Sequence, residues 1–528
     1  MTCVKISLAE ASEMTHVFRT VALTLWSAFV VGGQTPSAAI FWGALQPGPY
    51  AVGFRSAYQA DAARSYDPEY AAGGKPVAKK PRPIFLAVWY PAKTPATQPM
   101  VYRDYLRAIS VESPVPEFAQ RLRKFTRNSM CEYMLGKEYE SLSKKERDVW
   151  DNFLATPIAA YQNAPPAAGK FPAIVYHPGL GGTFEDDSVM FEYLASHGYV
   201  VVSSAYQNSD STELNIVGDF YTSLDDLTFV SRFTGTLPFV DTSQVTAMGH
   251  SYGAQAVLAW RAQPGSPVDA LVFLDSTVEY LGLEAPLFAN AKSMIGRNRT
   301  SAVPVILFAD RLRKPRFDTF DPYLSHAPRY EWTVDGQEHN DFISQGTIGE
   351  SLQARTGGDS RKAEAARRNY DEIGGRILLF LDAYVKRDAG ALTALRATGV
   401  NYKAPEAPEP TGRQLARMFA ADSDKARKLV TGLRGVPADV FLGAMSVLSE
   451  EGHEGKILAM LTLGAEVAPQ SSTLQQALGD VFEERGDKVK AADAYRKALE
   501  LLDGDSTILD LRKPVLRQQL DERLRGLR

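Results

Sequence analysis

Residues 249–253 read Gly-His-Ser-Tyr-Gly and match the G-x-S-x-G pattern of a nucleophile elbow. The run at 244–248 predicts a short buried strand before the pattern, and residues 254–260 predict a helix after it. Glycine suits both flanks of so sharp a turn, because a Cβ there would collide with neighbouring backbone. This context predicts that Ser251 is an exposed nucleophile at a helix N-terminus rather than an ordinary turn serine.

A serine nucleophile needs a general base, and three of the seven histidines follow Ser251 in the chain. In this kind of site the order along the chain is Ser, then Asp or Glu, then His. His453 lies in a predicted helical region near the C-terminus, and His326 lies in a Pro-rich loop. His339 directly follows the strand-like run 330–334. We therefore predict His339 as the base, the alternative being a surface-loop histidine.

Two aspartates are candidates for the acid that orients such a base. Asp275 ends the apolar run 270–274, and Asp310 ends the apolar run 303–309. Either strand would present its carboxylate at the C-terminal edge of a parallel sheet, where ligands of open α/β sheets bind. The carboxylate fixes the imidazole tautomer and stabilises the imidazolium formed during attack. The local sequence leaves both candidates open, and we expect the other aspartate to have a structural role.

A glycine-rich turn at residues 177–183 is the candidate oxyanion hole. It follows the predicted buried strand 171–176 and precedes a predicted helix at 185–197. A backbone amide of this turn can pair with the amide of Tyr252 to bind a developing oxyanion. The alternative is a phosphate site at a helix N-terminus. The turn lacks the G-K-[ST] of a P-loop and the G-x-G-x-x-G of a dinucleotide fold, which disfavours that alternative.

These segments, in this order, resemble the plasma-type platelet-activating factor acetylhydrolase family of α/β-hydrolases. The resemblance covers roughly residues 48–339 and rests on residues 48–53, 87–91, 179–181, 194–201, 249–253, 274–275 and 339–342. The oxyanion turn departs from the family pattern. The family usually has histidine immediately before the first glycine, whereas here Pro178 holds that position and the histidine is His177.

The resemblance implies an α/β-hydrolase fold, which is a mostly parallel sheet with helices on both faces. It favours Asp275 over Asp310 as the acid, because the family's acid follows the strand after the elbow. It suggests Leu180 as the second backbone donor beside Tyr252. It also implies hydrolysis of short or oxidised acyl esters, on a small molecule or a glycerophospholipid, without a metal or any other cofactor.

The composition is that of an ordinary folded protein. Of the 528 residues, 45% are hydrophobic and 23% are charged, and the length predicts more than one domain. The formal net charge of −4, with no basic patch interleaved with aromatic residues, argues against nucleic-acid binding. Cys3 and Cys131 are the only cysteines, too few for a CxxC metal site or a disulfide framework.

The N-terminal residues 1–39 predict a signal peptide. Arg19 precedes the apolar run 21–31, and small residues at 35–39 suit cleavage. The apolar run is short for a bilayer span. We therefore expect export to the periplasm or the medium, with an N-terminal anchor or a buried helix as alternatives.

Residues 100–165 predict a helical insert in the hydrolase domain. The segment has helical spacing and many charges and precedes the oxyanion strand, where it is placed to form a lid over the acyl pocket. Beside Leu122 and Phe125 it carries the basic residues Arg121, Arg123, Lys124 and Arg127. This face suits an anionic lipid surface, and a solvated helix face is the alternative.

The hydrolase domain is predicted over residues 40–400, followed by a Pro-rich linker at 401–412 and a helical domain at 413–528. Residues at tetratricopeptide spacing are Leu478, Gly479, Phe482, Gly486, Ala491, Tyr495 and Ala498, and 34 positions earlier Ala444, Leu448, Gly452, Ile457, Leu461 and Gly464. A helical bundle without repeat function is the alternative. Two repeats bury little core, so we expect them to dock on the hydrolase domain, a protein partner or another copy.

We interpret the chain as an exported serine hydrolase that cleaves carboxylic esters through an acyl-enzyme. One alternative is a peptidase or amidase with the same triad, because the elbow does not distinguish leaving groups. A second is a catalytically silent, hydrolase-like scaffold whose repeats bind protein. The second is disfavoured, because every catalytic residue type is present in order.

Overall fold

The computed structural model describes residues 40–66, 80–110, 113, 116–206, 220–263, 265–282, 285, 292, 295, 303–405, 410–433, 435–508 and 512–527. Ile40–Arg528 form one compact unit. The predicted signal peptide, Cys3 and residues 406–409 of the predicted linker lie outside the described residues. Cys131 is buried and its thiol is free. In the described part of the chain, no helix has the length and hydropathy needed to span a bilayer.

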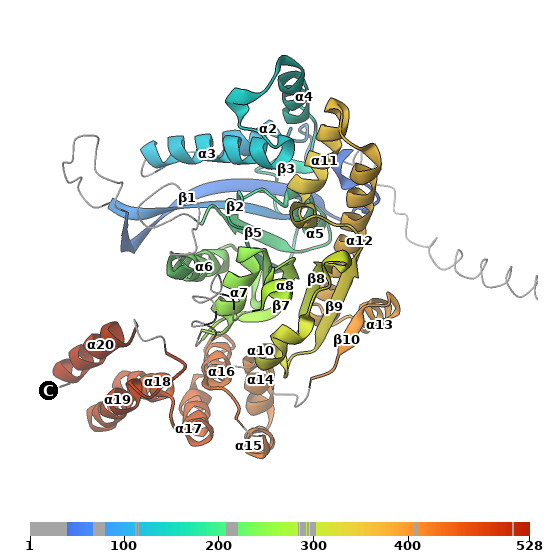
Figure 1. Ribbon diagram of the computed structural model, residues 1–528. Helices are drawn as coiled ribbons and strands as arrows, with labels where there is room; N and C mark the ends of the chain where they lie inside the picture. The colour runs from blue at the N-terminus through green and yellow to red at the C-terminus, as the bar shows by residue number, and fades with distance from the viewer. Residues whose placement is uncertain are drawn as a thin grey trace, which may run out of the picture. The chain divides into compact units, whose positions relative to one another are not determined.

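A ten-stranded sheet in the order β10-β9-β8-β7-β6-β4-β5-β2-β1-β3 organises the hydrolase part (Figure 1). The strands are β1 (Ala51–Tyr66), β2 (Lys80–Ala92), β3 (Ala160–Gln162), β4 (Phe171–His177), β5 (Val200–Ser204), β6 (Val240–His250), β7 (Val268–Leu274), β8 (Val305–Asp310), β9 (Arg329–Val334) and β10 (Asn401–Lys403). The central strands β5, β4, β6, β7, β8 and β9 pair in parallel, and β2 and β10 join them antiparallel. Strands β4, β5 and β8 are buried along their whole length, as expected for parallel strands covered on both faces.

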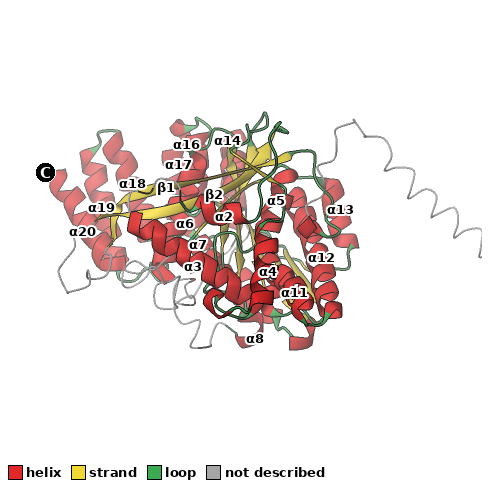
Figure 2. Ribbon diagram, turned by 90° about the horizontal axis from the view of Figure 1, so that it is seen from above, coloured by secondary structure: helices red, strands yellow, loops and turns green. Residues whose placement is uncertain are grey.

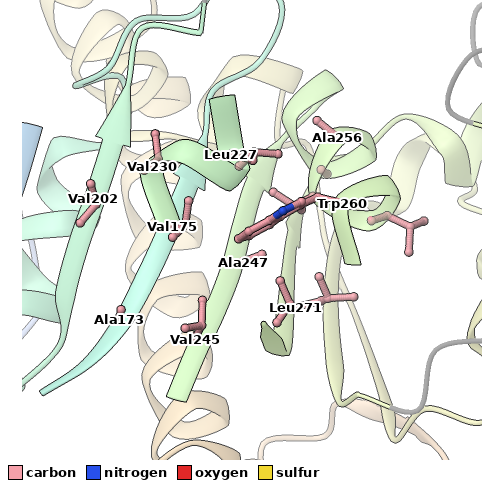
Figure 3. Packing of buried hydrophobic residues seen from close by; sticks show 14 of the residues in the cluster. Ala173, Val175, Val202, Leu227, Val230, Val245, Ala247, Ala256, Trp260 and Leu271 are labelled. Atoms are coloured by element: carbon pink, nitrogen blue, oxygen red, sulfur yellow. The ribbon is translucent and has the colours of Figure 1, made fainter. Parts of the chain in front are cut away.

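Helices cover both faces of this sheet. On one face lie α6 (Phe220–Gly235) and α7 (Tyr252–Arg261). Figure 3 labels part of the core that these helices form with the sheet: Ala173, Val175, Val202, Leu227, Val230, Val245, Ala247, Ala256, Trp260 and Leu271. On the other lie α5 (Ser188–Ser196) and α12 (Ser360–Tyr384). The remaining elements here are η1 (Ile40–Trp42), α8 (Val278–Leu281), η5 (Arg311–Arg313), η6 (Phe317–Phe320), α10 (Asp321–Leu324), η7 (His339–Phe342), α11 (Ser344–Thr356) and α13 (Ala389–Ala397). This is the predicted α/β-hydrolase arrangement, so the expected fold class is confirmed.

The segment predicted as an insert contains α2 (Arg103–Ala108), α3 (Pro116–Leu135), η2 (Tyr139–Ser141) and α4 (Lys144–Leu154) before it ends in β3. Figures 1 and 2 show α3 alongside the long β1–β2 hairpin. Tyr58 of β1 packs edge-on against Phe118 of α3, and its hydroxyl donates to the carbonyl oxygen of Ile109. Helix α3 also packs against α11, where the backbone of Met134 lies so close to Gly349 that a Cβ would crowd it.

In the C-terminal part, from residue 412 on, the regular elements among the described residues are all helices. Its elements are α14 (Gly412–Ala421), α15 (Ser423–Gly432), α16 (Ala438–Glu450), η8 (Glu454–Lys456), α17 (Ile457–Val467), α18 (Ser472–Glu484), α19 (Lys488–Leu502) and α20 (Lys513–Gly526). Helices α18 and α19 pack together, and Gly479 makes room for the ring of Tyr495, where a Cβ would collide with it. The sheet extends into the predicted linker, because β10 pairs with β9.

Ion pairs join the C-terminal helices to the hydrolase part, and two of them reach α7 and β7. Arg261, the last residue of α7, donates to Asp439 of α16 at 2.6 Å, and both side chains are only 7% exposed. Arg413 of α14 lies 3.2 Å from Asp269 of β7. The helix that begins at the predicted nucleophile therefore ends in a buried ion pair with the C-terminal part.

Candidate active site

Ser251 lies in a strained turn between β6 and α7, with φ 53° and ψ −122°. Positive φ is costly for a residue with a side chain, and such strain is concentrated at functional sites. A Cβ on Gly249 would collide with the backbone of Gly253, and a Cβ on Gly253 would collide with the carbonyl oxygen of His177. The geometry thus accounts for both glycines of the sequence pattern.

The structure brings Ser251, His339 and Asp275 together. His339 Nε2 lies 2.8 Å from Ser251 Oγ, and His339 Nδ1 is hydrogen-bonded to Asp275 Oδ2. Asp275 follows β7 directly, has φ 43° and is completely buried, whereas His339 begins η7 and is partly exposed. This is the arrangement of nucleophile, base and acid in a serine-hydrolase triad.

Asp310, the second candidate acid, binds backbone amides. Its Oδ1 accepts hydrogen bonds from the amide of Leu312 at 3.1 Å and from the amide of Gly336 at 3.0 Å. It therefore ties the loop after β8 to the turn that precedes His339. The structure places Asp275, and not Asp310, against the imidazole of His339.

The predicted oxyanion turn lies against the elbow. The amide of Gly182 donates to the carbonyl of Gly179 at 3.0 Å, which closes the turn around Leu180. A Cβ on Gly179 would lie 3.2 Å from Ser251 Cβ, so the two turns approach closely. Tyr252 opens α7, so its backbone amide lies at the N-terminus of this helix, directly after Ser251. The turn and the helix N-terminus thus flank Ser251 as an oxyanion hole requires.

Two residues of the insert hold this turn in place. Tyr133 of α3 donates its hydroxyl to the carbonyl of Leu180 at 2.7 Å, and Ser129 donates to the carbonyl of Gly181 at 2.6 Å. Sequence reasoning missed both residues. They precede the turn by about 50 positions and belong to no motif, so only their place on the helical insert hints at a role.

His250, an unspecified position in the elbow pattern, supports the base. Its Nε2 lies 2.9 Å from the carbonyl oxygen of His339. Burial, together with the nearby His339 ring, lowers the pKa of His250 to about 3, so its imidazole is neutral and Nε2–H donates this bond. His177 lies one position before the histidine of the family pattern. Its ring stacks on Tyr206, and its Nδ1 is hydrogen-bonded to the carbonyl oxygen of Pro178. Both histidines have structural contacts in the site.

Three consecutive buried carboxyl groups lie behind the oxyanion turn: Glu185, Asp186 and Asp187. Burial raises the pKa of Glu185 to about 7 and that of Asp187 to about 8, and it raises the pKa of Asp186 well above its usual value. Asp187 Oδ1 accepts from the hydroxyl of Tyr370 at 2.6 Å and from the amide of Ser344 at 2.9 Å. Near neutral pH, Asp186 and Asp187 are therefore held largely protonated, and Glu185 is divided between its protonated and ionised forms.

Among the described residues, one acidic group, Glu338, Asp341 and Glu350, has carboxylate oxygens close enough to share a metal ion. The ammonium group of Lys362 lies 2.7 Å from both Glu338 and Glu350. A lysine already supplies positive charge to two of the three carboxylates, so this group is explained without a metal.

Comparison with solved structures finds similar folds among known proteins. The fold is similar to that of a ferulic acid esterase from Streptomyces cinnamoneus solved at 2.4 Å resolution, with a TM-score of 0.44 and 16% sequence identity. The match covers 68% of this chain and 98% of that one. No protein-family model matches the sequence, and no curated protein matches it either.

Proposed function

We propose that this protein is a serine hydrolase that cleaves carboxylic esters through an acyl-enzyme. The observation that carries the proposal is the continuous hydrogen-bonded series from Ser251 through His339 to the buried Asp275. The strained φ of Ser251 supports it, because the turn holds Oγ within reach of the imidazole.

In the proposed mechanism, Ser251 Oγ attacks the ester carbonyl carbon while its proton passes to Nε2 of His339. Asp275 stabilises the imidazolium, and the backbone amides of Tyr252 and Leu180 donate to the oxyanion. The tetrahedral intermediate collapses when the imidazolium protonates the leaving alcohol. Water, deprotonated by His339, then attacks the acyl-serine. The imidazolium returns this proton to Ser251 Oγ as the acyl–oxygen bond breaks, which releases the acid and free Ser251.

A polar cleft of about 820 Å³ lies beside this site, between α3, η7 and α11. Its walls include Gly181 of the oxyanion turn and Asn340, the residue after His339. Other lining residues are Asn128, Tyr133, Glu132 and Gln353. Such a lining suits a hydrated alcohol or headgroup better than a long alkyl chain. We therefore propose esters with a polar alcohol portion; the short acyl chain and the phospholipid-type esters of this proposal rest on the family resemblance alone.

Turnover of p-nitrophenyl acetate, beside a peptide anilide, tests this assignment. We expect the acetate ester to be hydrolysed and a fluorophosphonate probe to label the protein. Faster cleavage of the anilide would favour a peptidase, whereas a folded protein with neither turnover nor labelling would favour a silent scaffold. A series of p-nitrophenyl esters of increasing acyl length then tests the preference for short chains.

We also propose that residues 1–39 direct export and that the C-terminal helices bind a protein partner or a second copy. The small residues at tetratricopeptide spacing support the second proposal, since α18 and α19 pack closely at Gly479. Cell fractionation and light scattering of the purified protein test these two proposals.

A further inference from the structure

The carboxylate of Asp275 has two partners besides the catalytic imidazole. The hydroxyl of Tyr280 donates to Asp275 Oδ1 at 2.7 Å. A guanidinium nitrogen of Arg313 lies 3.3 Å from Oδ2, the same oxygen that is bonded to His339. The guanidinium also lies over the ring of Tyr280, 3.8 Å from its centroid. Tyr280 and Arg313 thus contact both the carboxylate and each other.

The order of the strands positions these two residues beside Asp275. Tyr280 lies in α8, which follows β7 and Asp275, and Arg313 ends η5, which follows β8. Asp310 caps η5 through the amide of Leu312, and its own amide donates to the Tyr280 hydroxyl at 2.8 Å. The position of Arg313 therefore depends on contacts of the backbone and not on the long side chain alone.

The other titratable groups around Asp275 do not supply positive charge near neutral pH. Burial, and then the charge of Asp275, raises the pKa of Glu279 to about 8, and Glu279 is hydrogen-bonded to the hydroxyl of Ser276. His250 is neutral because burial lowers its pKa to about 3. The carboxylate of Asp310 is negatively charged or neutral, and it accepts hydrogen bonds from two backbone amides. Within the described part of the chain, the cation that faces Asp275 besides the His339 imidazole is Arg313.

We infer that Arg313 is a positioning residue of the proposed reaction, which disfavours the imidazolium form of His339 through the Asp275 carboxylate they share. A cation beside the acid offsets part of the negative charge that would otherwise stabilise a protonated imidazole. Removing this cation should therefore show in the acidic limb of the pH profile of activity, where protonation of the base stops the reaction. This inference rests on the proposed function.

The test is the pH profile of kcat/KM for p-nitrophenyl acetate in Arg313→Met, Arg313→Lys and the wild type. The Arg313 side chain is 42% exposed, and methionine retains an apolar stem over Tyr280, so we expect the fold to persist. At low ionic strength, Arg313→Met should move the acidic limb to higher pH by about half a unit to one unit, since solvent screens a partly exposed charge. Arg313→Lys should restore the wild-type limb.

A matched control comes from the same short helix. Arg311 contacts Thr333 and lies 3.4 Å from Asp335, away from the acid. Arg311→Met removes an equal charge nearby, and its acidic limb should match that of the wild type. Added sodium chloride should move the limb of the wild type toward that of Arg313→Met and leave Arg313→Met nearly unchanged.

The outcomes separate this inference from the proposed function. Ester turnover by the wild type, with an unmoved limb in a folded Arg313→Met variant, would overturn the role of Arg313 alone. Equal shifts in Arg311→Met and Arg313→Met would also overturn it, because they would indicate a general surface-charge effect. A wild type without ester turnover would overturn the proposed function and this inference together.

Discussion

The hydroxyl of Tyr280 links the two aspartates that end neighbouring strands, Asp275 after β7 and Asp310 in β8. It accepts from the amide of Asp310 at 2.8 Å and donates to Asp275 Oδ1 at 2.7 Å. The carboxylate of Asp310 instead binds amides of Leu312 and Gly336. Two aspartates that are equivalent in the sequence pattern therefore have different tasks, since one faces the imidazole and the other fixes two loops.

The first prediction compares these two aspartates. Asp275→Asn should lower kcat by up to about ten-thousandfold, because the amide favours the wrong imidazole tautomer of His339. Asp310→Asn keeps an oxygen that can accept from both amides, so its kcat should stay within about tenfold of the wild type. Steady-state kinetics of both variants provide the comparison, with thermal unfolding as the control for stability. If Asp310→Asn lost its activity while Asp275→Asn stayed active, Asp310 and not Asp275 would be the acid that orients His339.

The second prediction concerns the nucleophile. Ser251→Ala should abolish fluorophosphonate labelling and lower kcat on the order of a millionfold, the loss seen when a triad loses its nucleophile. Intact-mass spectrometry after labelling measures this directly. Ser276→Ala, a nearby buried serine bonded to Glu279, is the matched control and should still be labelled. Label on the Ser251→Ala variant at wild-type intensity would remove Ser251 from the role.

The elbow and the position of Ser251 follow from local sequence because local sterics specify them. A sharp turn between a buried strand and a helix requires glycine on both sides, and parallel order then brings the ends of β6 and β7 to one edge. For the acid, the family resemblance favoured Asp275, and the structure places Asp275 against His339.

The contacts that hold the site together were not predicted from the sequence. Tyr133 reaches Leu180 across 47 positions, and Arg313 reaches Asp275 across 38. Such contacts depend on how an insert and a loop pack in three dimensions, and no periodicity or spacing records them. Strand β10 was missed for a similar reason, since a three-residue edge strand is identified by its partner β9 and not by its own sequence.

The third prediction tests the support of the oxyanion turn by the insert. Tyr133→Phe removes the hydroxyl that donates to the carbonyl of Leu180 and should lower kcat about tenfold or more with little change in KM, because a misplaced amide weakens transition-state binding. Tyr139→Phe is the control, since the Tyr139 ring packs against Arg127 and Arg147 in the same insert. Equal kcat in Tyr133→Phe and the wild type would show that the turn holds its shape without this bond.

The fourth prediction concerns the ion pair between α7 and α16. Asp439→Ala leaves Arg261 buried without its partner and should lower the free energy of unfolding by about 3 kcal/mol. Replacing both residues with apolar side chains, Arg261→Met with Asp439→Leu, should recover most of this loss, because no unpaired charge remains. Urea unfolding of the single and double variants measures both values. A double variant as unstable as Asp439→Ala would argue that geometry, and not the buried charge, makes this contact important.

The last prediction follows from the buried carboxyl group of Asp187. Burial raises its pKa to about 8 in the folded protein, whereas an unfolded aspartate has a pKa of about 3.9. Between these values the folded state holds a proton that the unfolded state releases, so the contribution of Asp187 to the free energy of unfolding falls as pH rises.

The Asp187→Asn substitution introduces an amide that does not ionise, yet the amide oxygen can still accept from Tyr370 and Ser344. The variant should therefore gain stability over the wild type as pH rises from about 5 to about 8, by at most about 1.4 kcal/mol per pH unit. Urea unfolding at several pH values measures this gain, and Asp151→Asn on the exposed face of α4 is the control. A stability difference between Asp187→Asn and the wild type that stays constant over this range would contradict a protonated Asp187 in the folded protein.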